Sequence, residues 1–215
     1  MVRTCYLLFL FFAVFGGCAA QKLQLGTHST YSNSAFHTTA AYLVDVPVSK
    51  LDDVLHEIYV GIQDKPTKNL KWLFKNLGHH NNVEDDIVMA EKGFFFDPET
   101  SKYLLKLAIA MKKGDKFMYF DVEGNLCEAR INGKKNVKLT VTKKIKILNS
   151  ACFSLTAIPQ PGGKSLILLK SDMSFGWFFN LFFTESRYRS VMEWRIQGLA
   201  MNVKKRAEGD TGPNY

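Results

Sequence analysis

Apolar and polar residues alternate along much of the chain, and a period of two is typical of half-buried β-strands. The clearest case is 103–111, where every second residue from Tyr103 to Met111 is large and apolar, while lysine and alanine dominate the other face. We expect a strand there and further strands at 36–46, 86–96, 116–122, 126–131, 137–147, 152–158 and 165–169.

Short turn signals separate these predicted strands. Asn132-Gly133 is the strongest, because both residue types tolerate the positive φ angles of a two-residue hairpin turn. The segments 113–115, 123–125 and 159–163 carry further glycine or proline turn signals. Consecutive strands joined by short turns predict an antiparallel sheet.

Two segments near the start show helical spacing instead. After Pro47, apolar residues recur at intervals of three and four, which predicts a helix with Ser49 as its N-cap and with Asp52 and Asp53 in its first turn. A second amphipathic helix is expected over 68–77, ending at Gly78.

A long helix is predicted at the C-terminal end. Thr184 is a suitable N-cap, and the helix should run to about residue 207. Its apolar stripe, together with the aromatic residues that precede it, consists of Phe178, Phe182, Met192, Ile196, Leu199 and Val203. A sheet with one apolar face needs a cover, and this helix is the element able to provide it.

The first twenty residues predict export. Arg3 is followed by an apolar run over 6–15 and then by small residues, which is the order of a secretory signal sequence. Cleavage after Ala20 is one expected outcome. The alternative is a lipoprotein leader, since residues 15–18 resemble a bacterial lipobox in which Cys18 would be acylated. The mature protein would then be periplasmic or extracellular, and residues 21–35 are interpreted as a polar tether or a loose terminus.

Composition bounds the rest. Without the leader about 195 of the 215 residues remain, which fits one domain with a real core. The formal net charge is +8, and it falls to about +7 when Arg3 is removed. Such a surface either attracts anionic partners, including phospholipid headgroups, or is only a solvated basic face. No nucleic-acid motif accompanies the charge, so neither DNA nor RNA is expected as a partner. We expect a monomer.

Candidate chemistry is sparse. Cys127 and Cys152 fall in predicted strands and would either form a disulfide or remain buried thiols. His79-His80 with the acidic residues 84–86 is the one metal-like cluster, but adjacent histidines do not easily face one ion, so no metal site is expected. No cofactor fingerprint and no catalytic residue can be assigned.

The order of these elements resembles the START-like helix-grip superfamily, which includes polyketide cyclases and lipid-transfer domains. Three segments carry the resemblance: TAAYLVDVPVSKLDDVL at 39–55, ACFSLTAIPQPGGKSLILL at 151–169, and the amphipathic helix at 178–208. The sequence predicts seven strand segments between the short helices and the terminal helix, one more than the usual six. The resemblance implies an α+β helix-grip domain over 36–208, with 209–215 as a polar tail.

The resemblance also implies a cavity between a curved sheet and the terminal helix. Its expected lining comes from the first strand, the strand at 103–111 and the terminal segment. The lining residues are Tyr42, Tyr103, Leu105, Leu107, Ile109, Phe178, Phe182, Met192 and Ile196.

The leading hypothesis is therefore an exported, non-enzymatic protein that binds an apolar or amphipathic molecule such as a lipid. One alternative is a cyclase or aromatase-like enzyme that uses Tyr42, Tyr103 or Tyr119. Another is an envelope interaction module that uses its basic surface. The aromatic segment at 177–183 is either a portal that touches membrane or cargo, or the packed start of the terminal helix.

Overall fold

The computed structural model describes residues 24–66, 68–69, 87–111, 118–177 and 184–209. For 87–92, 107–111 and 118 it describes the backbone alone. The predicted leader, most of the second helix, the 113–115 turn, the His79-His80 cluster, Phe178 and Phe182 lie outside the described residues.

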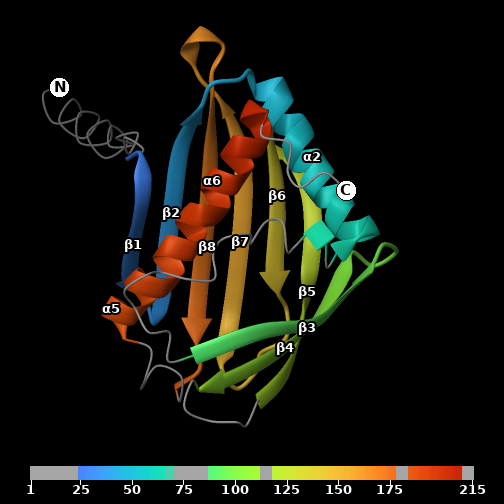
Figure 1. Ribbon diagram of the computed structural model, residues 1–215, viewed down its shortest axis with the longest axis vertical. Helices are drawn as coiled ribbons and strands as arrows, with labels where there is room; N and C mark the ends of the chain where they lie inside the picture. Colours follow the sequence, from blue (N-terminus) through green and yellow to red (C-terminus); the bar gives the residue numbers. More distant parts are fainter. Residues whose placement is uncertain (1–23, 67, 70–86, 112–117, 178–183, 210–215) are drawn as a thin grey trace, which may run out of the picture.

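Within the described residues, one antiparallel sheet of eight strands has the order β1-β2-β8-β7-β6-β5-β4-β3. The strands are β1 (Gly26–Ser32), β2 (Ala35–Val44), β3 (Ile87–Asp97), β4 (Lys102–Met111), β5 (Met118–Ile131), β6 (Lys134–Val141), β7 (Leu148–Pro159) and β8 (Ser165–Phe175). Helix α2 (Val48–Asp64) and the terminal helix lie on the same side of this sheet (Figure 1). The α+β helix-grip arrangement is thus confirmed.

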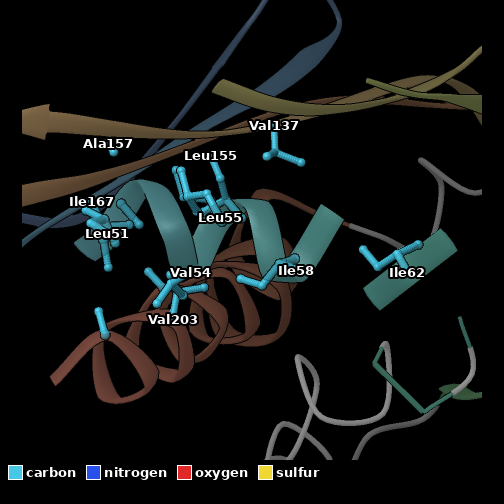
Figure 2. Packing of buried hydrophobic residues seen from close by; sticks show 14 of the residues in the cluster. Leu51, Val54, Leu55, Ile58, Ile62, Val137, Leu155, Ala157, Ile167 and Val203 are labelled. Carbon is cyan, nitrogen blue, oxygen red and sulfur yellow. The ribbon is translucent and has the colours of Figure 1, made fainter. Parts of the chain in front are cut away.

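Helix α2 buries the apolar stripe that its spacing predicted. Leu51 and Leu55 point toward the sheet, whereas Val54 points toward Val203 of the terminal helix (Figure 2). The predicted N-cap Ser49 is wrong, because the helix already begins at Val48, and for the same reason Asp52 and Asp53 lie beyond its first turn. Pro47 is the capping residue, and its extended φ of −64° and ψ of 153° set the start without a side-chain hydrogen bond.

Strand β5 corrects a second prediction. The 123–125 turn does not form, and the described parts of the two predicted strands, 118–122 and 126–131, belong to one strand of 14 residues. Gly124 continues the strand because the Tyr103 ring and the Thr140 carbonyl occupy the space where a side chain would stand. Among the described residues, six strands therefore lie between α2 and the terminal helix, the number that the resemblance implies.

The 137–147 segment is also not one strand. β6 ends at Val141, and β7 begins at Leu148 after a short loop in which Ile145 forms a single bridge to Leu148. The Asn132-Gly133 turn is confirmed, with φ angles of 51° and 74°.

The tether interpretation of 21–35 is wrong for Gly26–Ser32, which form β1 at the edge of the sheet. A two-residue turn at Asn33 and Ser34, both with positive φ, returns the chain into β2. The apolar pattern could not predict this strand, because its inward-facing Ser29 is buried against Thr38 rather than against an apolar partner.

The terminal helix crosses the concave face and packs on β2 and β8 (Figure 1). It consists of α5 (Glu185–Tyr188), a π-helical turn (Arg189–Glu193) and α6 (Trp194–Glu208). Thr184 is its N-cap, as predicted, and accepts a hydrogen bond from the Arg187 backbone N–H. Gly209 ends it with a φ of 105°.

Candidate functional site

The concave face of the sheet differs between its covered and its less covered parts. Beneath α2 and α6 it is fully buried, for example at Ala157 and Ile167. Farther along, the concave side chains of β3, β4, β6 and β7 pack against the core but remain partly exposed. We call these five residues the concave apolar patch: Phe94, Leu105, Leu139, Val141 and Phe153.

Strand register links the members of this patch. Phe94 lies opposite Leu105, and Leu139 lies opposite Phe153. Val141 packs against both apolar clusters of the molecule. An apolar ligand could cover the apolar area that remains accessible on the concave face of the sheet.

Tyr103, a predicted lining residue, forms part of the wall beside this patch. Its ring stacks on Phe94 with centroids 5.7 Å apart, and its hydroxyl donates a hydrogen bond to the Thr140 carbonyl at 3.2 Å. Burial raises the pKa of the Tyr103 hydroxyl well above its usual range. The side chain is therefore held as a neutral, structural part of the wall.

The other predicted lining residues are distributed over several surroundings. Tyr42 packs against the main core, and its hydroxyl is 2.8 Å from the Thr27 hydroxyl. Ile196 is buried in the same core, and Met192 packs partly exposed against the second cluster. Leu107 and Ile109 lie on β4, with only their backbone described.

A buried hydroxyl cluster was not predicted. Register places the hydroxyls of Ser29, Thr38 and Ser171 side by side across β1, β2 and β8, and Tyr188 covers them from the terminal helix. The Thr38 hydroxyl lies 2.9 Å from that of Ser29 and 2.8 Å from that of Tyr188. No local signal could reveal this cluster, because Thr38 and Tyr188 are 150 positions apart.

Tyr188 anchors the start of the terminal helix. Its ring stacks on Phe36, with centroids 4.0 Å apart and planes inclined by 8°. Burial raises the pKa of the Tyr188 hydroxyl, although the neighbouring Thr38 and Ser171 hydroxyls act in the opposite direction. No hydrogen bond of good geometry reaches the fully buried Ser171 Oγ.

Ionic contacts join α2 to the hairpin of β5 and β6. Asp52 Oδ2 accepts a hydrogen bond from Arg130 at 2.8 Å, and Glu128 contacts both His56 at 3.0 Å and Lys135 at 3.1 Å. Burial alone would raise the pKa of Glu128, but these two partners outweigh it and hold the pKa below its usual value. The contacts dock α2 onto the sheet.

The described residues contain no cluster of histidine, cysteine and carboxylate side chains able to hold a metal ion. Tyr119, a candidate for the enzyme hypothesis, is 70% exposed and lies on the outer face of β5. Asp45 is paired with Lys164 at 3.1 Å at the surface.

Of the two alternatives for Cys127 and Cys152, the disulfide does not form, since both thiols are free. Strand β6 lies between their strands, and two strand spacings amount to about 10 Å, beyond the reach of a disulfide. Burial raises the pKa of the Cys152 thiol, while Cys127 is exposed.

Comparison with known proteins relates this chain to others through its fold. No family model matches the sequence, and no curated protein matches it. Among solved structures it is similar to truncated norcoclaurine synthase from Thalictrum flavum, with 10% identity, a TM-score of 0.47, and coverage of 87% of this chain and 98% of that one.

Two further structures are similar in the same way. The Zhui aromatase/cyclase from Streptomyces sp. R1128 is 11% identical, with a TM-score of 0.43 and coverage of 83% of this chain and 99% of that one. A START superfamily protein from Mycobacterium smegmatis is 9% identical, with a TM-score of 0.45 and coverage of 81% and 99%. These likenesses concern the course of the backbone, so no residue role is transferred from them.

The strand order and the terminal helix by themselves give the chain an α+β helix-grip arrangement, as the order of its sequence elements predicted. Among the described helices, none combines the length and the apolar character needed to cross a bilayer.

Proposed function

We propose that this protein is an exported binding protein that holds an apolar or amphipathic small molecule between the sheet and the terminal helix. The concave apolar patch is the observation that carries the proposal. Its residues lie on the concave face of the sheet, yet they are only partly buried. A ligand that covered them would gain about 25 cal/mol for each Å² of apolar surface removed from water.

The tyrosine hydroxyls support binding rather than catalysis. A cyclase-like enzyme would need a polar group that is free to reach the substrate. The Tyr42 and Tyr103 hydroxyls are already engaged by Thr27 and by the Thr140 carbonyl, and Tyr119 lies on the outer face.

Neighbouring leucines on β4 allow a matched test of the binding proposal. Leu105 belongs to the concave apolar patch, and Leu104 lies on the opposite face of the same strand with similar partial exposure. We expect the full chain to bind a fluorescent fatty-acid probe, Leu105→Trp to weaken this binding at least tenfold by filling the patch, and Leu104→Trp to leave it unchanged. Equal affinities of the two variants, or no probe binding by the parent protein, would contradict the proposal.

Native mass spectrometry of protein purified from its own host should also detect a bound apolar molecule. The same preparation tests export, which is supported by the leader sequence alone. The expected mature terminus is Gln21 or an acylated Cys18. An N-terminus that still begins at Met1 in protein recovered from outside the cytoplasm would refute both processing routes.

A further inference from the structure

The loop between β6 and β7 lies against the end of β8. The Gly176 N–H donates a hydrogen bond to the Ile147 carbonyl at 3.0 Å, and the Asn149 side chain donates to the Phe175 carbonyl at 2.7 Å. Gly176 also approaches the Lys146 carbonyl so closely that a side chain there would collide with it. Trp177, the next residue, therefore lies beside the 142–147 loop.

Apolar and basic residues alternate in the 142–147 loop. Ile145 and Ile147 pack inward against the apolar clusters, and the lysines that alternate with them, Lys144 and Lys146, are exposed. Lys143 is compensated by Glu123 at 2.5 Å. Within the described part of the chain, neither Lys144 nor Lys146 forms an ion pair.

Trp177 is 77% exposed, more than any other large apolar side chain described. It stands at the end of the molecule where β8 finishes and β7 begins, drawn at the bottom of Figure 1. Exposing an indole ring in water is unfavourable, whereas the headgroup region of a bilayer accommodates both its apolar body and its N–H.

We propose that Trp177, Lys144 and Lys146 form a membrane-docking surface for bilayers that contain anionic phospholipids. The lysines supply charge complementary to the headgroups, and the indole inserts at the interface. This surface goes beyond the proposed ligand binding, because docking does not require that a cargo is bound. Docking would place the end of the domain that carries Trp177 against a bilayer, from which an apolar ligand could come.

Vesicle co-sedimentation of the full chain with phosphatidylcholine vesicles containing 30% phosphatidylserine tests the proposal. Each lysine near an anionic surface contributes about fivefold to the partition coefficient, so Lys144→Gln/Lys146→Gln should weaken binding about 25-fold. The matched control is Lys138→Gln/Lys170→Gln, which removes two exposed lysines from the outer face of the sheet. The control should keep most of the binding.

Trp177→Ala tests the apolar contribution, with Tyr119→Ala as an exposed aromatic control. We expect Trp177→Ala to weaken binding at least fivefold and Tyr119→Ala to have little effect. If the lysine pair matters but Trp177 does not, the surface binds polyanions in general and the lipid proposal is wrong. If the two lysine double variants are equivalent, only net charge matters and the site is refuted.

Hydrogen exchange locates the contact independently of the N-terminal leader, which every variant carries. Anionic vesicles should slow exchange of the amides in 142–147 and 175–177, and neutral vesicles should not. Binding without protection of these segments would refute the surface. Since no apolar probe is present in these measurements, their failure would leave the ligand-binding proposal standing, and the reverse also holds.

Discussion

Replacement of Gly124 by alanine should destabilise the sheet, because this residue sits where β4, β5 and β6 meet. Its missing side chain is replaced by the Tyr103 ring and by the Thr140 carbonyl, and an added Cβ would meet both closer than 3.0 Å. An aromatic ring over a glycine on the neighbouring strand is a known way to complete a sheet. The alanine variant must therefore displace Tyr103, β6 or both.

The cost can be estimated from two contributions. Overpacking a close-packed site costs about 1–3 kcal/mol, and loss of the Tyr103 hydrogen bond to the Thr140 carbonyl costs about 0.5–1.5 kcal/mol. Together they predict a loss of about 1.5–4.5 kcal/mol in the free energy of unfolding. For a domain of this size that corresponds to a fall in Tm of about 3–18 °C.

Thermal and urea unfolding followed by circular dichroism would measure the loss. Gly93→Ala is the matched control, since nothing lies within 4 Å of the position that its Cβ would take. It should change stability by less than about 1 kcal/mol. The double variant Gly124→Ala/Tyr103→Leu should recover only part of the loss, because the Thr140 carbonyl belongs to the backbone. A Gly124→Ala protein as stable as Gly93→Ala would refute the close packing described here.

Three further predictions concern titratable groups. Above pH ~10 the unfolded chain loses phenolic protons that buried Tyr103 and Tyr188 keep, so the free energy of unfolding should fall as pH rises. Urea unfolding at several pH values should show a smaller fall for Tyr103→Phe and for Tyr188→Phe than for the parent protein. Because the pKa of Glu128 is lowered in the folded state, its contribution is present above the ordinary carboxyl pKa and is lost as pH falls through the folded value. Glu128→Gln should thus flatten acid unfolding below pH ~4.5, and an unchanged acid limb would contradict this. Peptide-resolved alkylation should label Cys127 faster than Cys152, whose burial raises its thiol pKa, and discovery of a bond between them would contradict the strand order.

Local patterns predicted the fold where local energetics decide it. The Asn132-Gly133 turn, the Thr184 cap and the apolar stripe of α2 need only neighbouring residues to specify them, and all three form. Apart from the start of α2, which Pro47 sets one residue earlier than Ser49 predicted, predictions failed where partners distant in sequence decide the outcome. Glu123-Gly124-Asn125 reads as a turn until Tyr103 and Thr140 fill the space above the glycine.

The same reasoning explains β1 and the hydroxyl cluster. Gly26–Ser32 lacks an apolar face, so its composition suggests a tether, yet Thr38 satisfies Ser29 across the strand pair. Tyr188 likewise joins this cluster only because β2 and β8 are neighbours in the sheet. For the candidate site, the sequence identified Tyr103 and Leu105 on β4. It did not single out Phe94 or Phe153, whose positions depend on strand register.

The pairing of β2 with β8 has a consequence for how the protein folds. From β3 to β8, each strand pairs with the next one in the chain, so these hairpins can form soon after synthesis. The β2–β8 seam instead joins segments such as His37 and Asp172, which are 135 positions apart. Closing so large a loop is entropically expensive, and we expect it to be the slow step. Until β8 is synthesised, β2 cannot join the rest of the sheet, so a nascent chain would remain open and could not yet hold the proposed ligand.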